Sequence, residues 1–248
     1  MGQTLIECVL ADKSLELAAT LDARGSPAIG RRAGAVKVGW DVPKALKAGD
    51  VLIDFTRPDG TIEHLEACAR LGKSIVIGTT GIPGSLRKAI LQAGRRIPIA
   101  MSPNFAIGVN AVFKLAEVAA GILGDEFDVE IIEAHHRHKV DAPSGTALRK
   151  GEVVAQALGR DLKRDAVYGR EGVTGERKDN TIGFATVRGG DLVGEHSVMF
   201  IGTGERLEIS HRASSRANFA HGALRAARWV AAKKNGLYDM ADVLGFAK

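Results

Sequence analysis

The sequence predicts an α/β protein, with a parallel-sheet domain and a second α+β domain that carries a mixed or antiparallel sheet. The first domain is predicted because short apolar runs alternate with helical stretches in the first half of the chain. The second is predicted because three strand-like runs follow one another over residues 181–211 with only short turns between them. Glycine makes up 30 of the 248 residues, an enrichment expected in a chain with many tight turns.

The composition excludes several classes of protein. Hydrophobic residues make up 45% and charged residues 25% of the chain, which is ordinary for a globular protein and excludes a disordered or collagen-like chain. No apolar run approaches the ~20 residues that cross a bilayer, and the two cysteines are too few for a disulfide framework or a Cys-based zinc site. We therefore expect a soluble, cytoplasmic protein with no membrane partner.

The net charge of +5 favours an anionic partner. Two Trp and two Tyr offer few platforms for stacking bases, and no long block of Lys and Arg is present, so we expect no nucleic-acid partner. A small anionic substrate or a dinucleotide fits the charge as well.

The first part of the chain has the pattern of successive βα units. Apolar residues recur at helical spacing over residues 5–10 and alternate as in a strand over residues 15–21. The loops after the predicted strands are polar or rich in glycine, and in an open parallel sheet the ligand binds at these carboxyl ends. The further predicted strands are residues 51–55, 74–77 and 97–101. The helices predicted between them are residues 61–71 and 85–93.

The second part of the chain follows a long predicted helix, residues 110–123. A strand at 127–134 runs into a polar loop, and a helix is predicted over 144–158. Glycines stand in the short turns between three strand-like runs, at 189–190 and at 202, so we expect two hairpins. The three runs are 181–188, 193–201 and 206–211, and an amphipathic helix is predicted at 217–232.

Asp22 lies 20 residues after Gly2, at the end of the strand predicted over residues 15–21. An acid at this point of a βαβ unit binds ribose hydroxyls when it follows a glycine-rich phosphate turn by about 20 residues. No strand and no further glycines precede Gly2 in the sequence. Asp22 is therefore either a ribose ligand or an acid in a surface turn.

The segment EAHHRHKVDAPSGTA, residues 133–147, holds the densest group of ionisable side chains. A histidine moves protons near neutral pH, and a desolvated lysine does so too. The backbone N–H groups around Ser144, Gly145 and Thr146 begin a predicted helix and so make an anion site. We therefore expect a pocket that holds a carboxylate and protonates an atom beside it. The polar residues are His135, His136, Arg137, His138, Lys139, Asp141 and Ser144.

Simpler accounts of this segment stay open. Ser144 is also a good helix cap, and a histidine-rich loop is often merely solvated. His136 and His138 could share one face of a strand and bind a metal. No acid follows at matching spacing and no cysteine is near, so we expect no metal.

At three other positions the sequence is compatible either with ligand binding or with a structural role. Residues 78–81, GTTG, either line a cofactor or form a turn. Asn104 either bonds a carboxamide or caps a helix, and Arg216 with the two preceding serines either holds an anion or begins a helix.

With residues 133–147 and the motifs around them, the sequence resembles the dihydrodipicolinate reductase (4-hydroxy-tetrahydrodipicolinate reductase) family of the diaminopimelate route to lysine. The resemblance continues through DFTRP at 54–58, VIGTTG at 76–81 and PNF at 103–105. It then covers REGVTGER at 170–177, GFATVRGGDLVGEH at 183–196 and ASSR at 213–216, so nearly the whole chain from Gly2 is included.

The resemblance implies a Rossmann-type dinucleotide-binding domain and a second domain for substrate binding and oligomerisation. The last helix returns to the nucleotide domain in this family, so residues 1–106 and 217–248 would form that domain and residues 107–216 the other. A homotetramer is implied as well.

The resemblance also implies roles for individual residues. His135 corresponds to a proton donor and acceptor, and Lys139 to a second proton donor. His136, Gly145 and Thr146 correspond to substrate-binding positions. The residues that correspond to cofactor contacts are Met1, Asp22, Gly78, Thr79, Thr80, Ser102, Pro103, Asn104 and Phe105.

The implied activity is the NAD(P)H-dependent reduction of 4-hydroxy-tetrahydrodipicolinate to tetrahydrodipicolinate. A cationic loop would bind this small dianionic substrate, the nicotinamide would supply hydride, and His135 or Lys139 would supply the proton.

Two departures from the family pattern bear on the cofactor. Ala23 directly follows the ribose acid, Asp22, at a position where the family often has an arginine, and Arg24 comes one residue later. We therefore expect a moderate preference for NADH over NADPH. The glycine-rich turn is present only as Met1–Gly2, so we expect the natural protein to begin about 10–20 residues earlier. A catalytically impaired nucleotide-binding or assembly module is the alternative that this departure leaves open.

Overall fold

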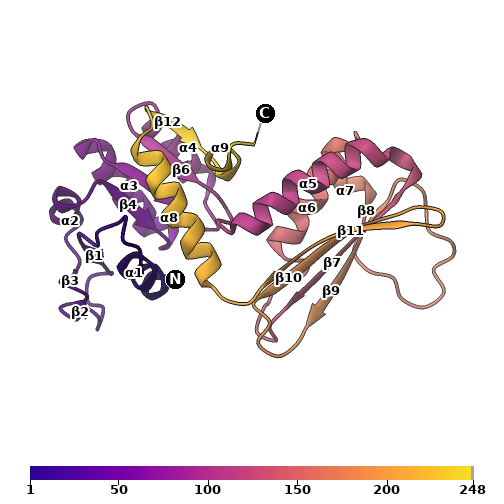
Figure 1. Cartoon of the computed structure of the whole chain (residues 1–248), viewed down its shortest axis with the longest axis horizontal. Coiled ribbons are helices and arrows are strands. Elements are labelled where there is room, and N and C mark those ends of the chain that lie inside the picture. Colours follow the sequence, from indigo (N-terminus) through magenta and orange to yellow (C-terminus); the bar gives the residue numbers. More distant parts are fainter. Residues whose placement is uncertain (247–248) are drawn as a thin grey trace. The chain divides into compact units, whose positions relative to one another are not determined.

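A computed structural model describes residues 1–246 of the chain. The chain divides into two compact units, whose elements are labelled in Figure 1. The first unit consists of Met1–Ile107 and Arg216–Lys248, and the second of Gly108–Ser215. These boundaries lie one residue from the domain boundaries expected from the sequence.

The first unit is built on a parallel sheet with the strand order β12-β6-β5-β4. Three of these strands are those predicted from apolar runs, whereas β12 has no counterpart among the predicted strands. β5 is buried along its whole length, as a central strand covered on both faces must be. The strands are β4 (Val51–Asp54), β5 (Ser74–Ile77), β6 (Pro98–Met101) and β12 (Gly236–Tyr238).

Helices cover both faces of this sheet. Because successive strand residues point to opposite faces, Ile75 and Ile77 enter one core and Val76 enters the other. The core around Val76 includes residues of α1 (Gly2–Ala11), α8 (Ala217–Ala231) and α9 (Met240–Leu244). The other core includes residues of α2 (Val42–Ala48), α3 (Pro58–Leu71) and α4 (Gly84–Ala93). The result is the layered α/β arrangement that the sequence predicts.

Local signals explain where these helices begin and end. α3 begins at Pro58, whose missing N–H is not needed in a first turn, and ends where Gly72 adopts a left-handed φ of 65°. The Asp41 carboxylate accepts the Lys44 N–H at 2.9 Å and so caps α2. α2 and α9 are too short to show a clear helical period in the sequence.

A second sheet in this unit has the order β1-β3-β2. The strand predicted over residues 15–21 is wrong for most of its length, because only β1 (Thr20–Leu21) is paired. In the described part of the chain, residues 15–19 have no strand partner. Leu15 packs instead against the core that α1 and α8 form. β2 (Arg32–Ala33) and β3 (Val36–Gly39) form a hairpin that the sequence pattern does not predict.

The second unit contains a mixed sheet with the order β11-β10-β7-β9-β8. β7 lies at its centre, antiparallel to β10 and parallel to β9. One face of this sheet packs against α5 and α6 through a core that includes Val129, Ile131 and Val198. The elements are α5 (Ile107–Leu123), η1 (Gly124–Glu126), β7 (Asp128–His135), α6 (Gly145–Ala157), α7 (Leu162–Asp165), β8 (Ala166–Val167), β9 (Ile182–Arg188), β10 (Gly194–Ile201) and β11 (Arg206–Ala213).

The hairpin expected between β9 and β10 is wrong, because β7 lies between these two strands. The chain after β9 crosses the end of β7: the Gly189 N–H donates to the His135 carbonyl at 3.0 Å, and the His136 N–H donates to the Leu192 carbonyl at 2.8 Å. The other expected hairpin is confirmed, since β10 and β11 pair antiparallel on either side of Gly202. Alternation of apolar residues marks a strand but does not choose its neighbour.

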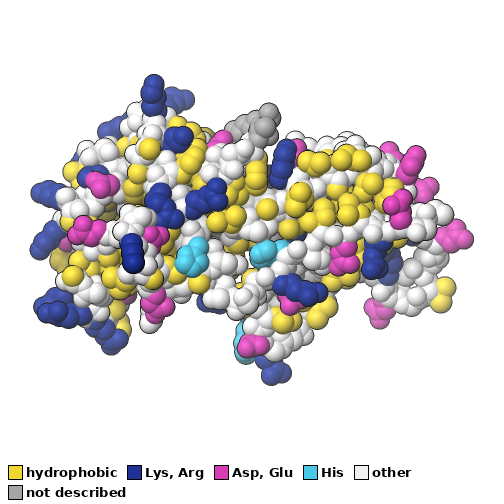
Figure 2. All heavy atoms as spheres, in the orientation of Figure 1, with side chains coloured by type: hydrophobic (Ala, Val, Ile, Leu, Met, Phe, Trp, Pro, Cys, Tyr) yellow, Lys and Arg dark blue, Asp and Glu magenta, His cyan; other side chains and the backbone are white. Residues whose placement is uncertain are grey.

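α5 has an apolar outer side as well as a buried one. With the turn after it, over Ile107–Glu126, it is long and apolar enough to cross a membrane by length and composition, a test that core helices of soluble proteins also pass. Ala116, Ala119 and Ala120 are buried in the core of the second unit. Leu115, Val118 and Ile122 are exposed, and hydrophobic side chains gather over α5 in Figure 2.

Candidate active site

A cavity of about 340 Å³ lies at the carboxyl ends of β4, β5 and β6 in the first unit. This is the edge at which parallel sheets bind ligands. Most of the residues expected to contact a cofactor line this cavity, namely Met1, Gly78, Thr80, Pro103, Asn104 and Phe105. Phe55, Thr56, Arg216 and Phe219 complete the lining.

Close packing shapes the wall of the cavity. The rings of Phe55 and Phe105 lie with their centroids 5.6 Å apart. Gly78 lies so close to Phe55 that a Cβ at this position would collide with the ring. Only glycine therefore lets the loop after β5 pass the phenylalanine and reach the cavity.

Two of the expected cofactor residues are buried and bonded to the protein itself. The Thr79 hydroxyl lies 2.7 Å from the Thr61 hydroxyl of α3, and Thr79 is 4% exposed. The Ser102 hydroxyl donates to the Asn104 carbonyl at 2.8 Å. The Asn104 side-chain oxygen accepts the Ala106 N–H at 2.9 Å, just before α5 begins. Thr79 and Ser102 hold the two loops in shape, and Asn104 combines a hydrogen bond that closes a turn before α5 with a place on the cavity wall.

Arg216 and Phe219 come to the cavity from a distant part of the sequence. Arg216 is the residue before α8, so it both begins a helix and lines the cavity. Of the two roles left open for it, the helix start is confirmed. Phe219 carries no chemical signal in the sequence, because an aromatic residue in an amphipathic helix is most often a core residue.

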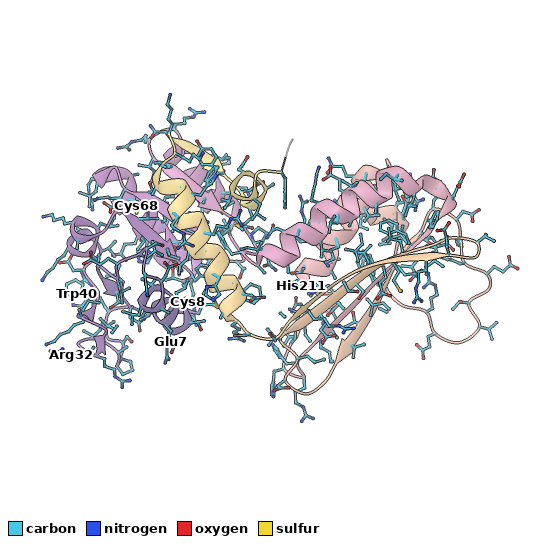
Figure 3. The ribbon with its side chains drawn as sticks, viewed as in Figure 1. Glu7, Cys8, Arg32, Trp40, Cys68 and His211 are labelled. Carbon is cyan, nitrogen blue, oxygen red and sulfur yellow. The ribbon has the colours of Figure 1, made fainter. Side chains whose placement is uncertain are left out.

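Asp22 lies outside the cavity lining, at the end of β1. Its carboxylate accepts the Ser26 hydroxyl at 2.6 Å and the Ala23 N–H at 2.8 Å, and these two hydrogen bonds lower the pKa of Asp22. The Arg24 guanidinium lies over the Trp40 ring, 4.0 Å from its centroid. Figure 3 labels Trp40 and Arg32 around this small sheet, and Figure 2 shows Lys and Arg side chains over the first unit.

The second unit contains a buried ionic arrangement at the end of β7. His135 Nδ1 lies 2.5 Å from a carboxylate oxygen of Glu133, and both residues are buried. The Arg188 guanidinium donates to both Glu133 oxygens, at 2.8 and 2.9 Å. The Ser144 N–H donates to the same carboxylate at 3.1 Å. Glu133 is thus almost fully paired, and it holds the His135 ring in one orientation.

Ser144 connects this arrangement to α6 and β10. Its hydroxyl accepts the Ala147 N–H at 3.2 Å and so caps α6, as one of the simpler accounts of this residue expects. The same hydroxyl lies 3.0 Å from His196 Nε2. The His196 ring packs edge-on against His135, with centroids 4.9 Å apart.

The loop after β7 brings the remaining expected residues near the start of α6. Lys139 pairs with Asp141 at 2.7 Å and is joined to His136 by a turn. His136 lies 6.2 Å from His138 by ring centroids, and no group of metal-binding side chains is found in residues 1–246. Gly145 and Thr146 form the first turn of α6.

The electrostatics of this group favour a neutral His135 ring beside an ionised Glu133. Burial lowers the pKa of His135, and the charges of Lys139 and Arg188 lower it further, against the opposite effect of Glu133. Burial raises the pKa of Glu133, but the hydrogen bonds from Arg188, His135 and Ser144 outweigh it, so the net pKa is lowered. An ionised Glu133 therefore faces a histidine whose Nε2 is left to exchange a proton.

Sequence patterns did not identify Glu133, Arg188 or His196 as site residues. Glu133 could have been found, because side chains two apart on a strand share a face and Glu133 stands two residues before His135. Arg188 and His196 reach the site from β9 and β10, and only the order of strands in the sheet brings them there.

The comparisons with known proteins agree with one another. The family description "Dihydrodipicolinate reductase, N-terminus" matches residues 1–105, and "Dihydrodipicolinate reductase, C-terminus" matches residues 108–244. Proteins named 4-hydroxy-tetrahydrodipicolinate reductase are 60% identical in Dechloromonas aromatica and 58% in Thiobacillus denitrificans, each over 99% of this chain and 94% of the relative.

A solved structure agrees as well. The dipicolinate-bound dihydrodipicolinate reductase from Paenisporosarcina sp. TG-14 has a TM-score of 0.79 at 26% identity, covering 97% of this chain and 94% of that one. A probable dehydrogenase from Thermotoga maritima, at 11% identity and a TM-score of 0.58 over 97% of this chain and 88% of its own, shares the fold alone. The chain therefore belongs to the dihydrodipicolinate reductase family.

Proposed function

We propose that the chain catalyses the NAD(P)H-dependent reduction of 4-hydroxy-tetrahydrodipicolinate to tetrahydrodipicolinate. The observation that carries the proposal is the buried His135–Glu133–Arg188 arrangement beside the start of α6, because it sets a proton-transferring histidine next to a helix end that attracts anions. Membership of the family supports the same reaction. The alternative of an impaired nucleotide-binding module has no observation in its favour among the described residues.

The first unit, Met1–Ile107 with Arg216–Lys248, would bind the cofactor. NADH or NADPH bound at the cavity would supply hydride to the substrate. Met1, Gly78, Thr80 and Asn104 would contact it along the cavity wall. Arg216 would contribute a positive charge toward a phosphate of the dinucleotide, since a guanidinium pairs well with phosphate oxygens. Asp22, which lies outside the cavity lining, would accept hydrogen bonds from the ribose hydroxyls.

The second unit, Gly108–Ser215, would bind the substrate. Lys139 and His136 would contact its carboxylates from the loop after β7. Gly145 and Thr146 would do so from the first turn of α6, where the helix dipole favours negative charge. The basic balance of the chain, at +5, is consistent with a dianionic substrate.

His135 and Lys139 would move the protons. In the free protein burial lowers the pKa of His135 and favours the neutral ring. Two substrate carboxylates nearby would oppose this effect, because negative charge favours the imidazolium form. His135 would thus take up, on substrate binding, the proton that it donates, and Lys139 would serve as a second donor.

The test is the oxidation of NADH by the purified chain with freshly generated substrate. We expect the absorbance of NADH to fall only when substrate and protein are both present. A rate equal to that without protein would overturn the proposed function. The same assay with NADPH in place of NADH measures cofactor choice.

The surroundings of Asp22 support a moderate preference for NADH. Its carboxylate would repel a 2′-phosphate, and the nearby Arg24 is stacked on Trp40. We expect Asp22→Asn to shift the kcat/KM ratio toward NADPH by about tenfold, which corresponds to ~1.4 kcal/mol. Asp59→Asn, an acid of α3, is the control that changes the net charge equally. If Asp22→Asn leaves the ratio of kcat/KM for the two cofactors unchanged, Asp22 does not bind the ribose hydroxyls.

A homotetramer is our proposal for the assembly. α5 and α6 pack on one face of the second sheet, and the other face carries the half-exposed or exposed residues Ile132, Val187 and Ile201. Exposed apolar side chains on this face, which stand among charged ones such as Glu130 and Glu195, support a surface that another copy covers. The mass measured by light scattering tests it, and a monomer mass at assay concentration would overturn it.

A cytoplasmic location is proposed on the basis of the family's biosynthetic role and of the cofactor, which such enzymes draw from the cytoplasm. Cell fractionation with an antibody against the chain would test it, and recovery in the membrane fraction would contradict it.

A further inference from the structure

Arg188 is the last residue of β9, and its guanidinium contacts two separate parts of the chain. It stands beside His135 in the register of β7 and β9. Nη1 and Nη2 donate to the two carboxylate oxygens of Glu133, at 2.9 and 2.8 Å. Nη2 also donates to the main-chain carbonyl of Asp141 at 2.7 Å. The first contact belongs to the arrangement that orients His135, and the second reaches the loop that carries Lys139.

This loop, residues 136–141, is held to the end of β9 at both of its own ends. At its start the His136 N–H donates to the Leu192 carbonyl at 2.8 Å, so the main chain holds it there. At its end the Asp141 carbonyl accepts the bond from Arg188. Figure 1 shows β7 and β9 as neighbours, which places both ends of the loop close to the residues that follow β9. The end of the loop therefore depends on a side chain where the start does not.

Packing gives the end of the loop little support. Val140 is 98% exposed, and the Asp141 side chain is 52% exposed. A segment with so little buried surface opens at a small cost in free energy unless hydrogen bonds hold it. The bond from Arg188 has a charged donor and so belongs to the stronger class of hydrogen bonds. Arg188 is therefore the main anchor of this end of the loop.

Asp141 extends this anchor to Lys139. The Asp141 carboxylate pairs with Lys139 Nζ at 2.7 Å, so the ammonium group is fixed by a residue whose main chain Arg188 holds. On the other side of the guanidinium, the Glu133 carboxylate lies 2.5 Å from His135 Nδ1. One guanidinium thus lies between the partners of the two proposed proton donors.

An arginine can make all of these bonds, whereas a lysine cannot. The guanidinium is planar and has several N–H groups in fixed directions, so it bonds both oxygens of a carboxylate and a carbonyl together. A lysine at position 188 could pair with Glu133, but it has no second nitrogen for the Asp141 carbonyl. The hydrogen bonds with Glu133 raise the pKa of Arg188, so the guanidinium stays charged.

We propose that Arg188 is a positioning residue that holds the loop of Lys139 in a fixed place relative to His135. It acts on the lysine through Asp141 and on the histidine through the carboxylate of Glu133. Both proton donors are then in place before substrate arrives, and substrate binding does not have to order the loop. The effect on substrate rests on the proposed function, whereas the hold on the loop does not.

The first test measures the loop in the free protein. Arg188→Lys keeps the positive charge beside Glu133 and should release the end of the loop. Hydrogen exchange of the Lys139 N–H, which donates to the His136 carbonyl at 3.1 Å, should become about tenfold faster, as the loss of a hydrogen bond from a charged donor implies. NMR measures this exchange. A rate equal to that of the wild type would overturn the proposal.

Arg177→Lys is the matched control. Arg177 also bonds a carboxylate and main-chain carbonyls, but it does so at the other end of β7, through Asp128, Val129 and Thr181. The substitution should therefore leave the exchange of the Lys139 N–H unchanged. An increase equal to that in Arg188→Lys would overturn the proposal, because it would show a general loosening of the sheet.

A second measurement needs no variant. In the wild type the bonds at both Nη atoms should prevent rotation of the Arg188 guanidinium, so NMR of labelled arginine should give separate Nη1 and Nη2 signals at this position. One averaged signal would overturn the proposal, because a rotating guanidinium cannot anchor the Asp141 carbonyl.

The third test separates positioning from a merely structural role. Arg188→Lys should raise the KM for substrate about tenfold and leave the KM for NADH unchanged, whereas Arg177→Lys should change neither. Lys139→Ala should raise the KM for substrate by a smaller factor in the Arg188→Lys protein than in the wild type, because the released lysine already binds substrate poorly. Equal factors in the two backgrounds would overturn the proposed effect on substrate. A wild-type chain with no reductase activity would overturn the proposed function alone, since the two NMR measurements need no substrate.

Discussion

Replacing His135 by alanine is expected to lower kcat by roughly 10²–10⁴-fold, the loss typical of removing a general acid or base. The reason is geometric: the ring is held on Glu133 at 2.5 Å with Nε2 left for the substrate. The KM for NADH should not change, because the proposed cofactor cavity is lined by residues of the other unit. Steady-state kinetics with both ligands varied would measure these effects.

Two variants of the same loop sharpen this result. Lys139→Ala should lower kcat and also raise the KM for substrate. The substitution removes a positive charge that binds the dianionic substrate, and it removes a proton source as well. His138→Ala, an exposed histidine of the same loop, should have wild-type kinetics. Wild-type kcat in His135→Ala would contradict the assignment of His135.

Replacing Glu133 by glutamine is expected to destabilise the protein by about 3 kcal/mol, as the loss of one partner from a buried ion pair does. The substitution keeps the shape of the side chain but leaves Arg188 without a carboxylate and weakens the hold on His135. The free energy of unfolding in urea would measure the difference. Glu130→Gln is a matched control on the same strand. The Glu130 side chain is 18% exposed against 1% for Glu133, so its loss should cost about 1 kcal/mol.

The effect of Glu133 should also depend on pH. Its folded pKa is below the ordinary value of 4.5, so the unfolded chain binds a proton more readily than the folded one. The stability that Glu133 contributes is complete above pH 4.5 and is lost as the pH falls through the lowered folded pKa. The difference between the wild type and Glu133→Gln should therefore shrink below pH 4.5. A difference that is constant with pH would show that Glu133 is not ionised in the folded protein.

The elements that could be predicted from the sequence are those with a long local signal. β4, β5 and β6 are continuous apolar runs, and the helices between them have clear periods and glycine stops. β2 and β12 are only two and three residues long, and β3 has no continuous apolar run. β12 joins its sheet only because the distant strand β6 is already in place. The path from β9 to β10 could not be predicted for the same reason, since a hairpin and a crossing over β7 have the same local pattern.

The candidate site divides in the same way. His135, Lys139 and the start of α6 are close in sequence, so one segment identified them. The partners that set their chemistry are distant: Arg188 lies on β9 and His196 on β10.

The discontinuous first unit has a consequence for the order in which the protein is made. Synthesis begins at the N-terminus, and domains usually fold as units in that order. The second unit is one continuous stretch, Gly108–Ser215, so all of its strands have been translated before α8. Until then the face of β5 and β6 that carries Val76 and Ala100 lacks Ala220, Ala223 and Leu224, and β6 lacks its neighbour β12. The segment translated first is therefore completed last, and during that delay its open apolar face is the part of the nascent chain that needs protection from aggregation.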